Sequence, residues 1–76
     1  MKILIVEDED LAVKKLQKTL SDVEPTAHVI GVTDSIKGTV NWLAQNPQPD
    51  LILMDIELAD GQSFEIFNHT RVTSPV

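Results

Sequence analysis

Runs of apolar residues separated by polar segments predict a series of β-strands along the chain. Ile3–Val6 is continuously apolar, and so are the central residues of Asp50–Asp55. Such runs are typical of strands that are buried on both faces of a sheet. Ala27–Val32 is less hydrophobic, so we expect this strand at a sheet edge. Thr73–Val76 has the pattern of the beginning of a further strand.

The segments between these runs repeat their apolar residues at helical spacing. Leu11–Asp22 is expected to form an amphipathic helix with apolar residues on one face and lysines on the other. Asp34 or Ser35 can cap a second helix, which must end before Asn46–Pro49. Trp42 lies off the apolar stripe of this helix, and we expect it to be half-buried. The expected buried positions are Ile36, Val40, Leu43 and Ala44.

A third, short helix is expected over Ser63–Asn68, with Phe64 and Phe67 facing inward and Ile66 outside that periodicity. The resulting alternation of strands and helices predicts an α/β fold, with a doubly wound parallel sheet and helices on both faces. In sheets of this kind, ligands bind beyond the carboxyl ends of the strands. The residues that follow each predicted strand are therefore the first place to look for chemistry.

Composition limits the classes of protein that need to be considered. The chain has 76 residues, of which 42% are hydrophobic and 24% charged, which is ordinary for one small globular domain. Its net charge of −6 repels phosphate backbones, so we expect no direct nucleic-acid binding by this segment. The longest apolar runs are four residues, too short to span a membrane. The absence of cysteine fits a reducing compartment, and we expect a cytoplasmic protein.

Acidic residues follow two of the predicted strands. Glu7 and Asp8 follow the first strand, Asp55 ends the third, and Glu57 comes two residues later. If these strands are neighbours in a parallel sheet, their carboxylates converge at one edge. Clustered like charges raise each other's pKa, so such a group usually serves a cation. Hard oxygen ligands without His or Cys indicate Mg²⁺ rather than zinc.

A carboxylate beside Mg²⁺ can attack phosphorus and form an aspartyl phosphate. The metal then reduces the repulsion between the anionic nucleophile and the phosphoryl oxygens. Simpler interpretations exist for each residue, because Glu7–Asp10 is also typical of a solvated helix start and Asp55 of a turn. Their shared position at two strand ends favours the functional interpretation.

Two motifs also carry a resemblance to a known family. Ile3–Asp8 (ILIVED) followed by a helix, together with Pro49–Leu58 (PDLILMDIEL), resembles the receiver domain of bacterial two-component response regulators. The resemblance implies a flavodoxin-like (CheY-like) sheet of strand order 2-1-3-4-5. Residues 1–76 would then form an incomplete receiver with about three strands, in the order 2-1-3, and flanking helices. The later strands and helices would be absent.

The resemblance implies a role for each acidic residue. Asp55 would be the phosphoryl acceptor, Asp8 a direct Mg²⁺ ligand, and Glu7 a ligand through water. The backbone carbonyl of Glu57 would be the third protein ligand, with its side chain beside the phosphoryl group.

The same resemblance implies partners and an output. A sensor histidine kinase would supply the phosphoryl group, and an effector domain beyond Val76 would carry the signal. The loop Ala59–Gly61, in which Gly61 is expected to have a positive φ, resembles that of receivers joined to LytTR-type DNA-binding domains. The family's switch Ser/Thr, its strand-five Lys and its switch aromatic residue would lie beyond Val76, so a complete phosphorylation switch is not expected within these residues.

Three functions remain open at this point. The leading one is a signalling receiver that is not an enzyme. The alternative is a phosphohydrolase-like enzyme with Asp55 as covalent nucleophile, although such enzymes generally have a second Asp where this chain has Glu57. The third is an inactive structural fragment. In the order 2-1-3, Leu51–Met54 would be an unpaired outer edge, which predicts self-association of the chain.

Overall fold

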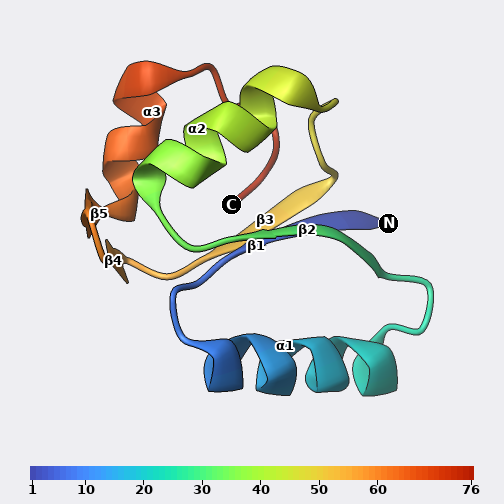
Figure 1. Cartoon of the computed structure of the whole chain (residues 1–76). Coiled ribbons are helices and arrows are strands. Elements are labelled where there is room, and N and C mark those ends of the chain that lie inside the picture. Colours follow the sequence, from blue (N-terminus) through green and yellow to red (C-terminus); the bar gives the residue numbers. More distant parts are fainter.

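A three-stranded parallel sheet forms the centre of the molecule, in a computed structural model that describes all 76 residues (Figure 1). The strands are β1 (Lys2–Val6), β2 (His28–Thr33) and β3 (Leu51–Met54), in the order β2-β1-β3. Residues 3–6 of β1 are at most 1% exposed, because strands pair with β1 on both sides and helices lie over both faces. The predicted parallel sheet, its strand order and the edge position of the second strand are confirmed.

Helices lie on both faces of the sheet, but the two faces are packed unequally. Helix α1 (Asp10–Val23) lies alone on one face, while α2 (Ile36–Gln45) and the short α3 (Ile66–His69) lie on the other (Figure 1). No residue of α1 is fully buried. None of the helices has the length and apolar character needed to cross a membrane. The principal core therefore lies under α2 and α3, and consists of Leu4, Val6, Ile36, Leu43, Ile52, Leu58 and Ile66.

A short antiparallel hairpin follows β3 and leads into the last helix. It consists of β4 (Glu57–Leu58) and β5 (Gly61–Gln62), and a 3₁₀ turn, η1 (Ser63–Glu65), connects it to α3. Gly61 has a φ of +142°, a backbone conformation that glycine adopts without steric cost. The positive φ expected at Gly61 is thus confirmed, whereas the hairpin itself was not predicted, since two-residue strands leave too short a pattern to detect.

The prediction that Phe64 and Phe67 face inward is wrong. They are 56% and 47% exposed, whereas Ile66 is completely buried. Residues three apart lie on the same side of this segment, and the side that packs into the core is the one that carries Ser63 and Ile66. Phe64 and Phe67 therefore share an exposed side, and Ile66 enters the core.

In the second helix, Ala44 is exposed, contrary to prediction, and Thr39 is fully buried. The Thr39 hydroxyl donates a hydrogen bond to the Ser35 carbonyl at 2.7 Å and lies 2.7 Å from the Thr33 hydroxyl. A buried hydroxyl with hydrogen-bond partners does not carry the cost of an unsatisfied one. The apolar pattern missed Thr39 because it treats every threonine as polar.

The expected strand at Thr73–Val76 is not formed, although this segment lies along the outer edge of β3. The Ile52 amide donates a hydrogen bond to the Pro75 carbonyl at 2.9 Å. The Ser74 hydroxyl donates to the Pro49 carbonyl and, at 3.1 Å, to the side-chain carbonyl of Gln48. A single backbone hydrogen bond is too little for a strand, but it places the C-terminal segment beside β3.

Trp42 is half-buried as expected, and its partner is a glycine of the edge strand. A Cβ atom added to Gly31 would lie 2.5 Å from Nε1 of the Trp42 indole and 2.7 Å from its Cε2. The indole therefore occupies the space above the β2 backbone that a side chain at position 31 would need. Gly31 is required by this close approach, and α2 packs against β2 through it.

We expect Gly31→Ala to destabilise the chain by about 1–3 kcal/mol, because the added methyl group forces the indole out of its packed position. Urea unfolding followed by circular dichroism measures the loss. Trp42→Leu removes the crowding atoms, so Gly31→Ala combined with Trp42→Leu should cost less than the sum of the single variants. Strictly additive costs would contradict the steric explanation.

Candidate functional site

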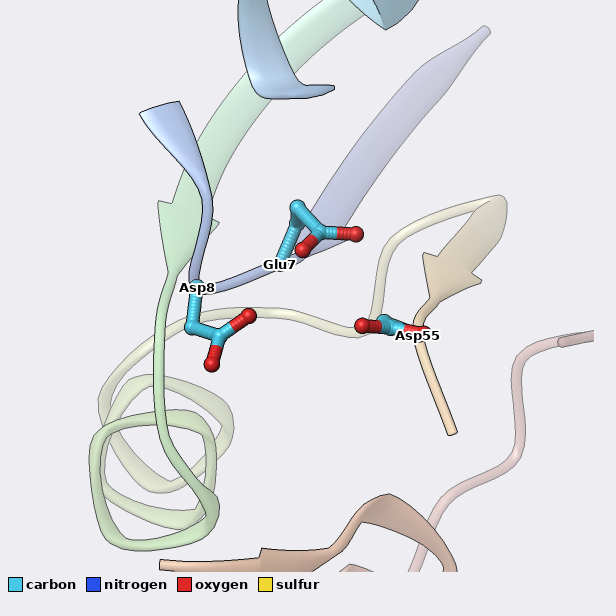
Figure 2. Close-up of side chains that lie close together, drawn as sticks. All are labelled: Glu7, Asp8 and Asp55. Atoms are coloured by element: carbon cyan, nitrogen blue, oxygen red, sulfur yellow. The ribbon is translucent and has the colours of Figure 1, made fainter. Parts of the chain in front are cut away.

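Three carboxylates converge where β1 and β3 end. The two strands pair in parallel up to Val6 and Met54, so the residues that follow both leave the sheet at the carboxyl ends of the strands. Glu7 and Asp8 follow β1, Asp55 follows β3, and one carboxylate oxygen of each lies within 4.8 Å of those of the other two. Figure 2 shows the three side chains directed toward a common space. We refer to Glu7, Asp8 and Asp55 as the acidic group.

Backbone hydrogen bonds fix the positions of two of these residues. The Asp55 amide donates to the Val6 carbonyl at 2.9 Å, and the Glu7 amide donates to the Thr33 carbonyl at 2.9 Å. The ladders on both sides of β1 thus continue one residue beyond the strands. The Ile56 amide donates to Oδ1 of Asp55 at 2.8 Å, which orients that carboxylate. The convergence of the acidic group is therefore a direct consequence of the sheet.

The electrostatics of the acidic group are unfavourable without a cation. Burial is the largest cause that raises the pKa of Glu7, and the nearby Asp55 and Asp8 raise it further. The Glu9 amide, which donates to Oε1 of Glu7 at 3.2 Å, acts in the opposite direction. Glu7 is half-buried, whereas Asp8 and Asp55 are exposed and accessible from solvent. The group offers several hard oxygen atoms to a small hydrated cation.

A hollow of about 350 Å³ adjoins the acidic group between α1 and the sheet. Glu7 and Asp55 lie at its polar end, and Leu16 of α1 lines it from the helix side. The remaining lining residues are Ile5, Val6, Leu53 and Met54. Two members of the acidic group therefore face a space bordered mainly by apolar side chains.

Glu57 is the one predicted site residue whose side chain lies outside this group. It is exposed in β4, where it pairs with Gln62 of β5. The structure brings Glu7, Asp8 and Asp55 together and leaves the Glu57 carboxylate apart from them. The role implied for the Glu57 backbone carbonyl stays a prediction.

Asp60 has a structural role that sequence reasoning missed. Its carboxylate accepts hydrogen bonds from the amides of Ile36 (2.8 Å) and Lys37 (3.2 Å) in the first turn of α2. The Ile36 amide is the main reason that the pKa of Asp60 is lowered. Of the two predicted caps, Ser35 does cap the helix, accepting from the Gly38 amide at 2.9 Å. No local pattern could have revealed Asp60, because it is 24 residues from Ile36 in the chain.

Comparison with known proteins identifies the family of the chain. The family model of the response regulator receiver domain matches residues 3–75, and the chain belongs to this family. The chain is 37% identical over 68 residues to the sensory transduction protein LytT of Bacillus anthracis, covering 90% of the chain and 27% of the relative. It is 44% identical over 62 residues to the phyllosphere-induced regulator PhyR of Methylorubrum extorquens, covering 80% of the chain and 22% of that relative.

A solved structure gives the same result at the level of the fold. A mutant of the anti-anti-sigma factor PhyR from Bartonella quintana superimposes with a TM-score of 0.72 at 26% identity, covering 93% of this chain and 30% of that one. The chain thus spans about a quarter of the length of the curated relatives it matches. Two-component signalling by a receiver domain, a signalling rather than a catalytic class of protein, is the function that these similarities support.

The raised pKa of Glu7 leads to a pH-dependent prediction for the metal-free chain. A carboxyl group whose pKa is higher in the folded state destabilises the fold when it ionises. The free energy of unfolding therefore falls as the pH rises from the pKa in the unfolded state, 4.5, through the pKa in the folded state. Glu7→Gln should therefore raise the free energy of unfolding at pH 7 by a few tenths of a kcal/mol, the scale expected for half-exposed charges. Urea unfolding at several pH values measures it. The gain in free energy of unfolding of Glu7→Gln over wild type should shrink as the pH falls below 4.5, and a gain that stays constant would contradict the electrostatic cause.

Proposed function

We propose that Asp55, as part of a complete receiver domain, accepts a phosphoryl group from a sensor histidine kinase, with Mg²⁺ bound at the acidic group. One observation carries the proposal: three carboxylates meet at the ends of neighbouring parallel strands in a chain of the receiver family. We further propose that residues 1–76 are an incomplete receiver, because the sheet has three of the five strands of a flavodoxin-like sheet.

The acidic group fits the ligand preferences of Mg²⁺. This ion is bound by one or two carboxylates and keeps several of its waters. Asp8 and Asp55 would be the direct carboxylate ligands, Glu7 would act through water, and the Glu57 backbone carbonyl would complete the protein ligands. When bound, the ion neutralises the negative charge of the carboxylates and of the incoming phosphoryl oxygens.

Phosphoryl transfer to Asp55 is a single displacement at phosphorus. A carboxylate oxygen of Asp55 forms a bond to phosphorus while the bond from phosphorus to the donor's imidazole nitrogen breaks, which leaves the imidazole with its electron pair. The Ile56 amide orients the attacking carboxylate through Oδ1. The acyl phosphate formed is a signal that is read through conformation, so we infer that the chain is not an enzyme.

The output and setting follow from the same proposal. The similarity to LytT and the Ala59–Gly61 loop favour an effector of the LytTR DNA-binding type, and the sequence that follows Val76 in the gene tests this. That effector, rather than this segment with its charge of −6, would contact nucleic acid. We place the reaction in the cytoplasm, where ATP supplies the kinase. No observation favours the phosphohydrolase alternative, since the Glu57 carboxylate lies outside the acidic group.

Millimolar Mg²⁺ should raise the melting temperature, because an ion that binds only the folded state stabilises it. At ten times the Kd the gain is about 1.4 kcal/mol, or about 6–11 °C for a domain of this size. Asp8→Asn should abolish the shift. Asp10→Asn removes the same charge from an exposed residue outside the acidic group and should leave the shift intact. An unchanged response in Asp8→Asn would remove Asp8 from the site.

Phosphorylation should occur once, at Asp55, and only with Mg²⁺. When residues 1–76 are joined to the remaining strands of a receiver, a small phosphodonor should add one phosphate, detected by intact-mass measurement and removed by hydroxylamine. Residues 1–76 alone should show little stable modification, because the cationic side chain that the family supplies from strand five is missing. Asp55→Asn should block the reaction, with Asp22→Asn as the matched control. Equal phosphorylation of Asp55→Asn would show that the assigned nucleophile is wrong.

We also propose that the 76-residue chain self-associates through the outer edge of β3. Only the Ile52 amide is joined to the C-terminal segment there, through Pro75, so further backbone groups are available to a second chain. Sedimentation at micromolar concentration should show dimers or larger species that dissociate on dilution. A compact monomer that unfolds cooperatively over the same concentration range would contradict this proposal.

A further inference from the structure

The hairpin that follows Asp55 is hydrogen-bonded to helix α2 through the side chain of Asp60. Asp60, in the turn between β4 and β5, accepts hydrogen bonds from the Ile36 and Lys37 amides at 2.8 and 3.2 Å. At its base, the hairpin is closed by the Ser63 amide, which donates to the Ile56 carbonyl at 2.7 Å. Ile56 is the residue next to Asp55. A short, hydrogen-bonded unit thus connects the start of α2 to the candidate phosphoryl acceptor.

The start of α2 is also connected to the other side of the acidic group. Only Asp34 and Ser35 separate α2 from the end of β2, where the Thr33 carbonyl accepts a hydrogen bond from the Glu7 amide at 2.9 Å. On the opposite side, the Asp55 amide donates to the Val6 carbonyl at 2.9 Å. Hydrogen bonds and chain segments thus form a closed path. It runs from Glu7 through β2, α2 and the hairpin to Asp55, and from there back to β1. Asp60 supplies the side-chain link in this path.

The fit between the hairpin turn and α2 leaves little freedom. A Cβ atom at Gly61 would lie 3.0 Å from Cδ1 of Ile36 and 3.2 Å from Oε2 of Glu65. The turn therefore packs directly on the first residue of the helix. In addition, the Ile36 amide lowers the pKa of Asp60, so this carboxylate is ionised at neutral pH and the link is charge-assisted.

We propose that Asp60 is a positioning residue for metal binding and phosphoryl transfer at Asp55. By holding the hairpin against α2, Asp60 fixes the segment Asp55–Glu57 and thereby the distance of the Asp55 carboxylate from Glu7 and Asp8. Asp60 itself contacts neither the metal nor the phosphoryl group. The proposal rests on the function proposed above for Asp55. Small displacements of reacting groups cost large factors in rate, which is why a remote link of this kind matters.

The chain offers a matched control for the test. Ser35 caps the same helix, accepting from the Gly38 amide at 2.9 Å, but its side chain makes no hydrogen bond to the hairpin. Asp60→Ala and Ser35→Ala each remove a cap from α2, so both should lower its stability. Only Asp60→Ala breaks the link to the hairpin. A purely structural role predicts that the two variants behave alike at the acidic group.

The experiment is an NMR titration with Mg²⁺ that follows the backbone amides of Glu7 and Ile56. Asp60→Ala should raise the Kd for Mg²⁺ about five- to tenfold, Asp60→Asn should restore part of the affinity because it retains an acceptor oxygen, and Ser35→Ala should stay within twofold of wild type. Before Mg²⁺ is added, the Ile56 amide resonance should move in Asp60→Ala and stay in place in Ser35→Ala. Equal changes in the two alanine variants, or none in Asp60→Ala, would overturn the proposal.

The two proposals fail in distinguishable ways. If wild type binds no Mg²⁺, the proposed function is wrong, and the metal-free Ile56 resonance still decides whether Asp60 positions this segment. If Asp60→Ala fails to fold, Asp60→Asn with the same two readouts takes its place. If Asp60→Asn matches wild type in the Ile56 resonance and in the Kd for Mg²⁺, the charge of Asp60 is dispensable. If Asp60→Gly also matches wild type in both, the positioning role is overturned.

Discussion

The pairing of β1 with a parallel strand on each side is the constraint on which the rest of the structure depends. Residues Ile3–Val6 lose nearly all contact with water, and burial of such side chains contributes roughly 1.5–3 kcal/mol each. Because β2 and β3 both follow the direction of β1, their carboxyl ends must meet at its end. Glu7 and Asp55, whose amides continue these ladders, cannot separate without breaking them. The apolar core therefore holds together two carboxylates, those of Glu7 and Asp55, that would otherwise move apart.

The anchoring of the site uses mostly backbone atoms, which leaves the side chains available for chemistry. The amides of Glu7 and Asp55 continue the sheet ladders, and the β4–β5 hairpin is closed by backbone pairs. Asp60 is the exception, since its carboxylate replaces a backbone partner at the start of α2. A mainly backbone framework tolerates many residue types, so the identity of a few acidic residues can be decided by function alone.

The parts of this structure that could be predicted are those governed by local patterns. The continuous apolar runs in β1 and β3 are short, which favours buried strands, and the carboxylates at their ends converge once the strands are parallel. The strand order itself came from the family resemblance. Prediction failed where non-local or geometric factors decide. The core packs against Ile66 rather than Phe64 and Phe67, a hydrogen-bonded pair buries Thr39, and Asp60 caps a helix that begins 24 residues earlier. None of these leaves a periodic signal in the sequence.

The unequal packing of the two faces has a consequence for how the acidic group fluctuates. Asp8 lies on the segment that leads into α1, the helix without a fully buried residue, whereas Asp55 is held by the sheet and the hairpin. Elements with little buried surface open more often than the core, independently of global unfolding. The carboxylates thus belong to units of different local stability. If α1 opens locally, Asp8 moves away while Asp55 stays in place, so that the occupancy of any cation here depends on the local stability of α1.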